Sequence, residues 1–309
     1  MKYALALFCL FVSAAGAQNY PAAPVEEVLV TGEHPGPGLW KVWNGDHVLF
    51  ILGTHSPLPR GLKWRSQEVE LVITEAQQVI GKYSASFTLE GGDLGSLTGP
   101  KLKKVLPRKS YREWERLKKK YIGDVKDVET LWPVTAALVL RSAAFEQAGF
   151  DGEDRIWDEI ERLALSYHVP VTIDHQVDTP VRLDTLQDAK SQQIGVDFLV
   201  NTIATVEANV RTARTAANAW SVGDVGALTE QAQAERSYAD LYAKSWPFLT
   251  SAELQDLSAR TDQRWLDAAD QALHKNRTTF AAIPIFLLLQ KDGVLSALRA
   301  KGYEVEAPH

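Results

Sequence analysis

The stretch that decides the fold reads LWKVWNGDHVLFILGT and covers residues 39–54. Two runs rich in β-branched and aromatic residues, 39–43 and 47–52, flank the tripeptide Asn44-Gly45-Asp46. Asn-Gly adopts the positive φ angles that a tight turn between strands requires, so the pattern predicts a β-hairpin. Pro57 and Pro59 then end the second run, because proline cannot donate a hydrogen bond to a strand ladder. The globular fold is therefore expected to begin at Leu39.

Helical and strand patterns alternate after the hairpin. Ser66 is expected to cap a helix, and the next strand is expected at Val79-Ile80. The apolar stripe of that helix is Val69, Val72, Ile73 and Ala76. Further helices are predicted within 100–167 and over 184–218, 224–244, 251–273 and 293–301, and further strands over 169–174, 279–284 and 303–305. The sequence thus predicts one α/β domain, residues 39–309, whose central mixed sheet comes from the N- and C-terminal parts around a large helical insertion.

The N-terminus has the composition of an export signal. Lys2 precedes an uncharged apolar run over residues 3–15, and Ala15-Gly16-Ala17 gives the small-x-small pattern of a cleavage site before Gln18. The run is shorter than the roughly 20 residues that a membrane-spanning helix needs. We therefore expect residues 1–17 to be a cleaved signal peptide and the protein to be periplasmic or secreted. Residues 18–38, rich in proline and glycine, are expected to be an extended, unpaired leader.

Charge and cysteine content exclude several classes of function. The formal net charge is −6, which gives no global indication of binding to nucleic acid or to anionic membranes. The one cysteine, Cys9, lies in the predicted signal peptide, so the mature chain can form no disulfide, thiolate nucleophile or Cys-ligated metal site. A metal would need His, Asp and Glu ligands. No transmembrane segment is expected after signal cleavage.

A basic stretch with interleaved Tyr111 and Trp114 covers residues 101–120. A surface for an anionic ligand and a solvated helix face are both compatible with it. Runs of like charge are usually solvated, so we expect a solvated face.

Several motifs, in order along the chain, resemble the TraB/GumN family, relatives of the Tiki metalloproteases. The motifs are Leu39-Trp40-Lys41-Val42, Leu49-Phe50-Ile51-Leu52-Gly53-Thr54, Ala219-Trp220-Ser221-Val222-Gly223-Asp224, Phe280-Ala281-Ala282, Asp292-Gly293-Val294-Leu295 and Gly302-Tyr303-Glu304-Val305. The resemblance covers nearly all of residues 39–305. It implies a divalent-metal-dependent hydrolase, and it raises the prospect of a homodimer.

The resemblance also implies three metal ligands: a His after the Gly-Thr pair, an acid after the next strand and a second His in the C-terminal motif. Ser56, Lys82 and Leu287 stand at those positions of this chain. His55 lies one residue early, and adjacent side chains of a strand point to opposite faces. Lysine repels a dication, so we expect no metal and no cofactor. Of the helix signature Arg-Asn-x-x-Trp, Trp265 remains, while Asp262 and Thr261 replace the Asn and the Arg and Arg260 is shifted by one.

Three functional hypotheses follow. The first is a catalytically degenerate family member that binds a peptide or another envelope component. The second is a divergent metal-dependent hydrolase with relocated ligands, and the third is a structural or assembly partner that works through the leader or the basic stretch. The catalytic candidates are His55, Ser56 and Glu75. The expected pocket residues are Gly53, Thr54, Lys82, Arg260, Asp262, Arg264 and Leu287.

Overall fold

The computed structural model describes residues 4–6, 33–34, 36–64, 67–90, 98–125, 127–150, 154–173, 177–182, 189–229 and 251–308. The rest of the predicted signal peptide and leader, the predicted cap Ser66 and most of the predicted helix over 224–244 lie outside these residues. Within them, no helix combines the length and the apolar character needed to cross a membrane.

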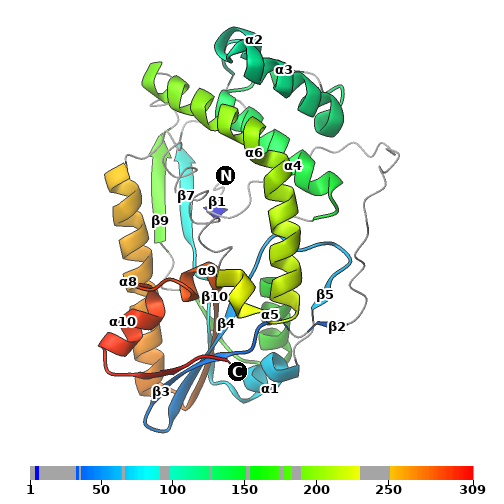
Figure 1. Cartoon of the computed structure of the whole chain (residues 1–309). Coiled ribbons are helices and arrows are strands. Elements are labelled where there is room, and N and C mark those ends of the chain that lie inside the picture. The colour runs from blue at the N-terminus through cyan, green and yellow to red at the C-terminus, as the bar shows by residue number, and fades with distance from the viewer. Residues whose placement is uncertain are drawn as a thin grey trace.

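A six-stranded mixed sheet forms the centre of the lower half of the molecule (Figure 1). Its strand order is β11-β3-β4-β10-β6-β8. The strands are β3 (Trp40–Asn44), β4 (His47–Thr54), β6 (Gln78–Ile80), β8 (Val171–Thr172), β10 (Thr278–Pro284) and β11 (Glu304–Glu306). The predicted hairpin is confirmed, since β3 and β4 pair in antiparallel fashion around Gly45, whose φ is 63°. The α/β fold class with a mixed sheet built from the two ends of the chain is confirmed as well.

The parallel part of the sheet sets the position of the candidate site. β10 pairs in parallel with β4 on one side and with β6 on the other, and β6 pairs in parallel with β8. β10 is almost entirely buried, as expected for a central strand covered on both faces. Strands from opposite ends of the chain are therefore direct neighbours, and their carboxyl ends lie at one edge of the sheet.

Helices cover the two faces of this sheet (Figure 1). The helices near the sheet are α1 (Gln67–Glu75), α5 (Arg155–Ser166), α8 (Ser251–Lys275), α9 (Ile285–Leu288) and α10 (Val294–Ala300). On α1, Val69 and Ile73 of the predicted stripe are buried in the same hydrophobic cluster as the strands. The amphipathic pattern thus identifies the face that packs on the sheet.

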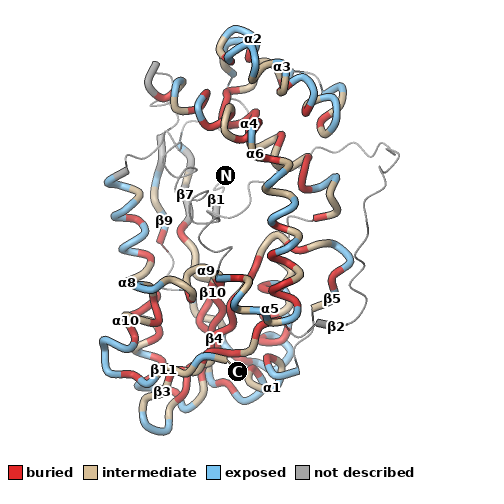
Figure 2. The backbone as a smooth tube through the Cα atoms, in the orientation of Figure 1, coloured by how far each residue is buried: buried red, intermediate tan, exposed pale blue. Residues whose placement is uncertain are grey.

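A second, mostly helical part carries its own hydrophobic cluster. It comprises α2 (Leu102–Val105), α3 (Arg108–Leu117), the π-helix η2 (Lys118–Ile122), the 3-10 helix η3 (Val128–Thr130) and α4 (Pro133–Gln147). These elements pack on α6 (Ala189–Ser221), and Figure 2 shows buried residues along the contact of α4 with α6. Val210 of α6 packs against both hydrophobic clusters. Helix α6 therefore connects the helical part to the sheet.

Three strand pairings were not expected from the sequence. β7 (Ala85–Glu90) and β9 (Val177–Arg182) pair in parallel, and β1 (Ala4–Ala6) pairs in antiparallel fashion with β7. β2 (Glu33–His34) pairs in parallel with β5 (Lys63–Trp64), so this end of the predicted leader is paired rather than free.

Candidate functional site

The carboxyl ends of the parallel strands bring distant segments together. His55 and Ser56 follow β4, Lys82 and Tyr83 follow β6, and Leu287 lies on α9, which follows β10 directly. We call these five residues the carboxyl edge. Open α/β sheets bind ligands outside the carboxyl ends of their strands, so the carboxyl edge is the position at which this fold is expected to hold a ligand.

The Gly-Thr pair at the end of β4 has a structural role. A Cβ on Gly53 would come within 2.8 Å of the Ile285 side chain, so only glycine lets α9 approach this closely. The Gly53 carbonyl accepts a 2.7 Å hydrogen bond from Nε1 of the buried Trp220, at the end of α6. The ring of Trp64 lies 6.0 Å from that of Trp220. Thr54 pairs with Pro284 at the last register position of the two strands.

His55 lies in the protein interior at the end of β4. It is 5% exposed, whereas Ser56 is half-buried. Burial lowers the pKa of His55 to about 4, because the charged imidazolium would lose its hydration there. At neutral pH the ring is therefore neutral, so it can bind a partner or a ligand only as a neutral donor or acceptor.

Lys82 forms an ion pair across the carboxyl edge. Its Nζ contacts Oδ2 of Asp154, the residue that precedes α5, and the two side chains are 30% and 24% exposed. The sequence neighbours of Lys82 include no acid, and the carboxylate comes from a residue 72 positions later. This ion pair was missed from the sequence. The only signal for it is an aspartate directly before an amphipathic helix, a common capping position.

Tyr83 links the carboxyl edge to α8. Its hydroxyl donates a 2.5 Å hydrogen bond to Oδ1 of Asp262. Burial, followed by this hydrogen bond, raises the pKa of Tyr83 well above its usual range, so the phenol stays protonated. Trp265, one turn further along α8, is fully buried, and its Nε1 has no hydrogen-bond acceptor among the residues described. A buried indole N–H usually has an acceptor, so this unsatisfied donor is an exception to the usual pattern.

The other predicted pocket residues on α8 face away from Asp262. Arg260 is exposed and pairs with Asp256 at 2.8 Å, and Arg264 is exposed as well. The structure thus brings Asp262 to the carboxyl edge through Tyr83 and leaves the two arginines on the outer face of the helix.

Glu75 lies at the opposite end of the sheet from His55. It ends α1, three residues before β6 begins at Gln78. Gln78 is in register with Thr279, and Thr279 with Leu49, near the start of β4. From Leu49 to His55 the strand rises about 20 Å at about 3.3 Å per residue. The structure therefore does not bring these two catalytic candidates together.

The fold and the carboxyl edge define a class: an α/β protein whose site lies at the carboxyl ends of strands from both ends of the chain. The family model for the TraB/PrgY/gumN family matches residues 38–307, nearly the whole chain. The chain therefore belongs to the TraB/PrgY/gumN family. No curated protein and no solved structure matches it.

The residues at the carboxyl edge do not fit the divalent metal that the family resemblance implies. Ser56 supplies a weak neutral donor, Leu287 has no donor atom, and Lys82 is a cation paired with Asp154. Zinc sites in proteins use three or four strong ligands from His, Cys, Asp and Glu. The described residues contain no group of three such side chains close enough to hold a metal ion.

Proposed function

We propose that this protein is an exported family member that binds a ligand at the carboxyl edge and lacks the metal-dependent hydrolysis of its relatives. The observation that carries the proposal is the ion pair of Lys82 with Asp154. Lys82 is a cation at the position where the family resemblance implies an acidic metal ligand. The carboxylate that contacts Lys82, that of Asp154, is already paired with it.

The chemistry of the remaining groups supports binding rather than metal-dependent hydrolysis. His55 is a single neutral imidazole, and one such ligand does not hold a catalytic metal. The carboxyl edge combines a neutral polar group, the hydroxyl of Ser56, with the apolar side chain of Leu287. Binding sites for organic ligands commonly combine apolar walls with a few convergent polar groups. We propose a peptide or another component of the cell envelope as the ligand.

Metal binding by a rebuilt variant tests the proposal. The triple variant Ser56→His, Lys82→Glu, Leu287→His restores the donors that the family resemblance implies. We expect wild-type protein to show no bound metal by elemental analysis and no change in melting temperature with Mn²⁺, Co²⁺ or Zn²⁺. We expect the triple variant to melt at a higher temperature with metal, because a ligand that binds only the folded state stabilises it.

A matched control separates donor chemistry from altered packing. The variant Ser56→Ala, Lys82→Gln, Leu287→Met changes the same positions without adding His or Glu, and it should show no metal response. A stoichiometric metal in the wild-type protein that is lost in His55→Ala would contradict the proposal and establish a hydrolase-type site with relocated ligands.

A further inference from the structure

The charge of the chain is distributed very unevenly. Residues 101–120 hold ten of the 33 Lys and Arg but only two of the 39 Asp and Glu. This segment therefore carries a formal charge of +8, and the other residues, 23 basic and 37 acidic, carry −14. The segment folds as α2, α3 and the start of η2 at one extremity of the molecule (Figure 1).

The basic side chains of α3 share one side of the helix. At about 100° per residue, Arg108, Lys109, Arg112 and Arg116 fall within an arc of about 100°, opposite the buried residues Trp114 and Leu117. Figure 2 shows exposed residues along the outer side of α2 and α3. The helix is therefore oriented with its apolar side inward and its basic side outward.

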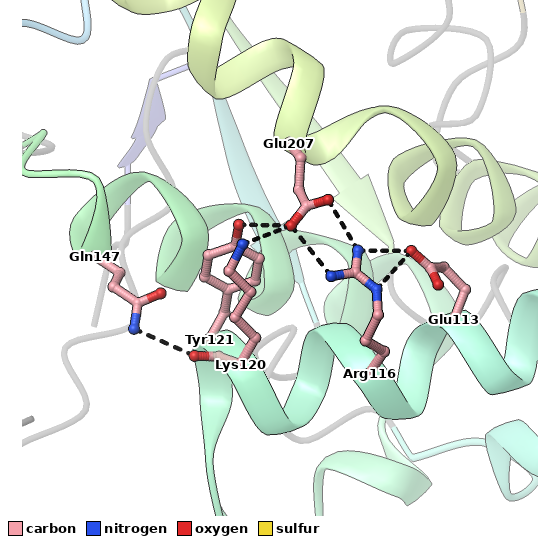
Figure 3. A network of polar contacts seen from close by, with 6 residues as sticks. All are labelled: Glu113, Arg116, Lys120, Tyr121, Gln147 and Glu207. Atoms are coloured by element: carbon pink, nitrogen blue, oxygen red, sulfur yellow. Dashed lines mark hydrogen bonds and ion pairs between the residues drawn. The ribbon is translucent and has the colours of Figure 1, made fainter. Parts of the chain in front are cut away.

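A polar network fixes this orientation (Figure 3). Glu207 of α6 accepts hydrogen bonds from Nη2 of Arg116 at 2.8 Å, Nζ of Lys120 at 2.7 Å and the hydroxyl of Tyr121 at 3.0 Å. Arg116 also donates to Glu113 at 2.7 Å. We call these five residues the Glu207 clasp. The clasp uses two cations at the border of the arc to attach α3 and η2 to α6.

Of the other eight cations of the segment, Lys118 pairs with Glu129, and seven are exposed and form no ion pair among the described residues. Lys119 is one of these seven and lies on η2. The other six lie on α2 and α3 or directly before α2: Lys101, Lys103, Lys104, Arg108, Lys109 and Arg112. We call these six residues the basic face. The basic face lies on the outside of a helix pair, so its shape is convex. A single polymer strand is usually held in a groove. A convex face therefore suits a flat anionic surface better than it suits a polymer strand.

We propose that the basic face binds the anionic surface of a lipid bilayer. Each Lys or Arg near such a surface contributes favourably, and the attraction acts within about one Debye length. The negative charge of the other residues is repelled by the same surface, so the protein binds in one orientation, with α2 and α3 toward the lipid. In this proposal neither the apolar side of α3 nor the carboxyl edge contacts the lipid.

Vesicle co-sedimentation tests this proposal. The probes are vesicles of phosphatidylcholine alone and vesicles with 30% phosphatidylglycerol, at 50 and 300 mM salt. We expect the full chain to bind the anionic vesicles at least tenfold more tightly than the neutral ones, and to lose most of this binding at the higher salt concentration. The face variant, Lys104→Gln, Arg108→Gln, Lys109→Gln, Arg112→Gln, is expected to bind at least tenfold more weakly than wild type.

The matched control removes four exposed cations elsewhere that form no ion pair in the part of the chain that the structure describes: Lys63→Gln, Lys275→Gln, Lys291→Gln, Arg299→Gln. It has the same net charge as the face variant and should bind within about threefold of wild type. Thermal melts of both variants report whether they remain folded.

Three results would overturn the proposal. One is equal binding to the two kinds of vesicle, and a second is equal loss in the face and control variants. The third is tighter binding to a soluble acidic polysaccharide, polygalacturonate, than to the anionic vesicles, which would assign the basic face to a soluble polymer instead.

Discussion

His55 is a titratable side chain that the fold keeps away from water. In the folded protein burial lowers its pKa to about 4, from the ordinary value of 6.5. In the unfolded chain the ring returns to water and recovers its ordinary pKa. Between the two values the unfolded chain binds a proton that the folded protein does not bind, so acidification favours unfolding in this range.

We predict that the protein loses stability as the pH falls from about 6.5 to about 4, by up to about 3 kcal/mol from His55 alone. Urea unfolding at several pH values measures this loss. His55→Gln removes the titrating group and should flatten the profile in this range. His274→Gln, which changes an exposed histidine, serves as the control substitution. An equally steep profile in His55→Gln would contradict the prediction.

At the scale of residues, the sequence indicates the positions of candidate site residues better than it indicates which side chains contact them. The family motifs give Ser56, Lys82 and Leu287 their positions along the chain, and the strands that these residues follow are neighbours in the sheet. Asp154 could not be assigned to Lys82, because their contact depends on how α5 packs against the sheet. Hydrophobic periodicity does not encode such side-chain pairings.

At the scale of elements, the Glu207 clasp connects α6 to the contiguous elements α3 and η2, which lie far from it in the sequence. Interactions with Arg116 and then Lys120 lower the pKa of Glu207 to about 2, and its side chain is 32% exposed. A carboxylate whose pKa is lowered by folding stabilises the protein above its ordinary pKa of 4.5, and this contribution is lost as the pH falls toward 2. Partial exposure reduces the effect, because solvent screens the charges.

We predict that Glu207→Gln lowers the free energy of unfolding by about 1 kcal/mol at pH 7 and increases amide exchange in α3 and η2. Urea unfolding and hydrogen exchange measure the two effects. Glu115→Gln removes an exposed carboxylate of α3 that belongs to no ion pair in the described structure, and it serves as the control. Equal effects of the two substitutions would show that net charge, rather than the clasp, is responsible.

Elements with a strong local pattern were predicted well. The hairpin, β10 and the amphipathic helices α1, α5 and α8 all follow periodicities or turn residues that act over a few positions. The pairing of β7 with β9 was missed, because Pro180 lies inside β9 and proline argues against a strand. Both strands belong to the small sheet outside the six-stranded one.

At the scale of the whole molecule, the N-terminal sequence implies processing of the chain. We predict that protein recovered from the periplasm of a Gram-negative host begins at Gln18, which intact-mass measurement or N-terminal sequencing would show. Ala17→Arg places a large charged residue where signal peptidase accepts small ones, so it should leave the precursor uncleaved. Ala22→Arg, five residues further on, should be processed normally. A cytoplasmic protein that retains Met1 would contradict the prediction.

The length of helix α6 affects how far the carboxyl edge lies from α2 and α3. The helix contains 33 residues, bends along its course (Figure 1) and is held by both hydrophobic clusters, so it acts as a strut between the helical part and the sheet. One part of the strut carries the Glu207 clasp, and its C-terminal end delivers Trp220 to the carbonyl of Gly53. If α2 and α3 rest on a bilayer, the strut sets the height of the carboxyl edge above the lipid headgroups. A ligand would then be captured from the layer at that height, and lengthening or shortening α6 by whole turns would change which layer the protein samples.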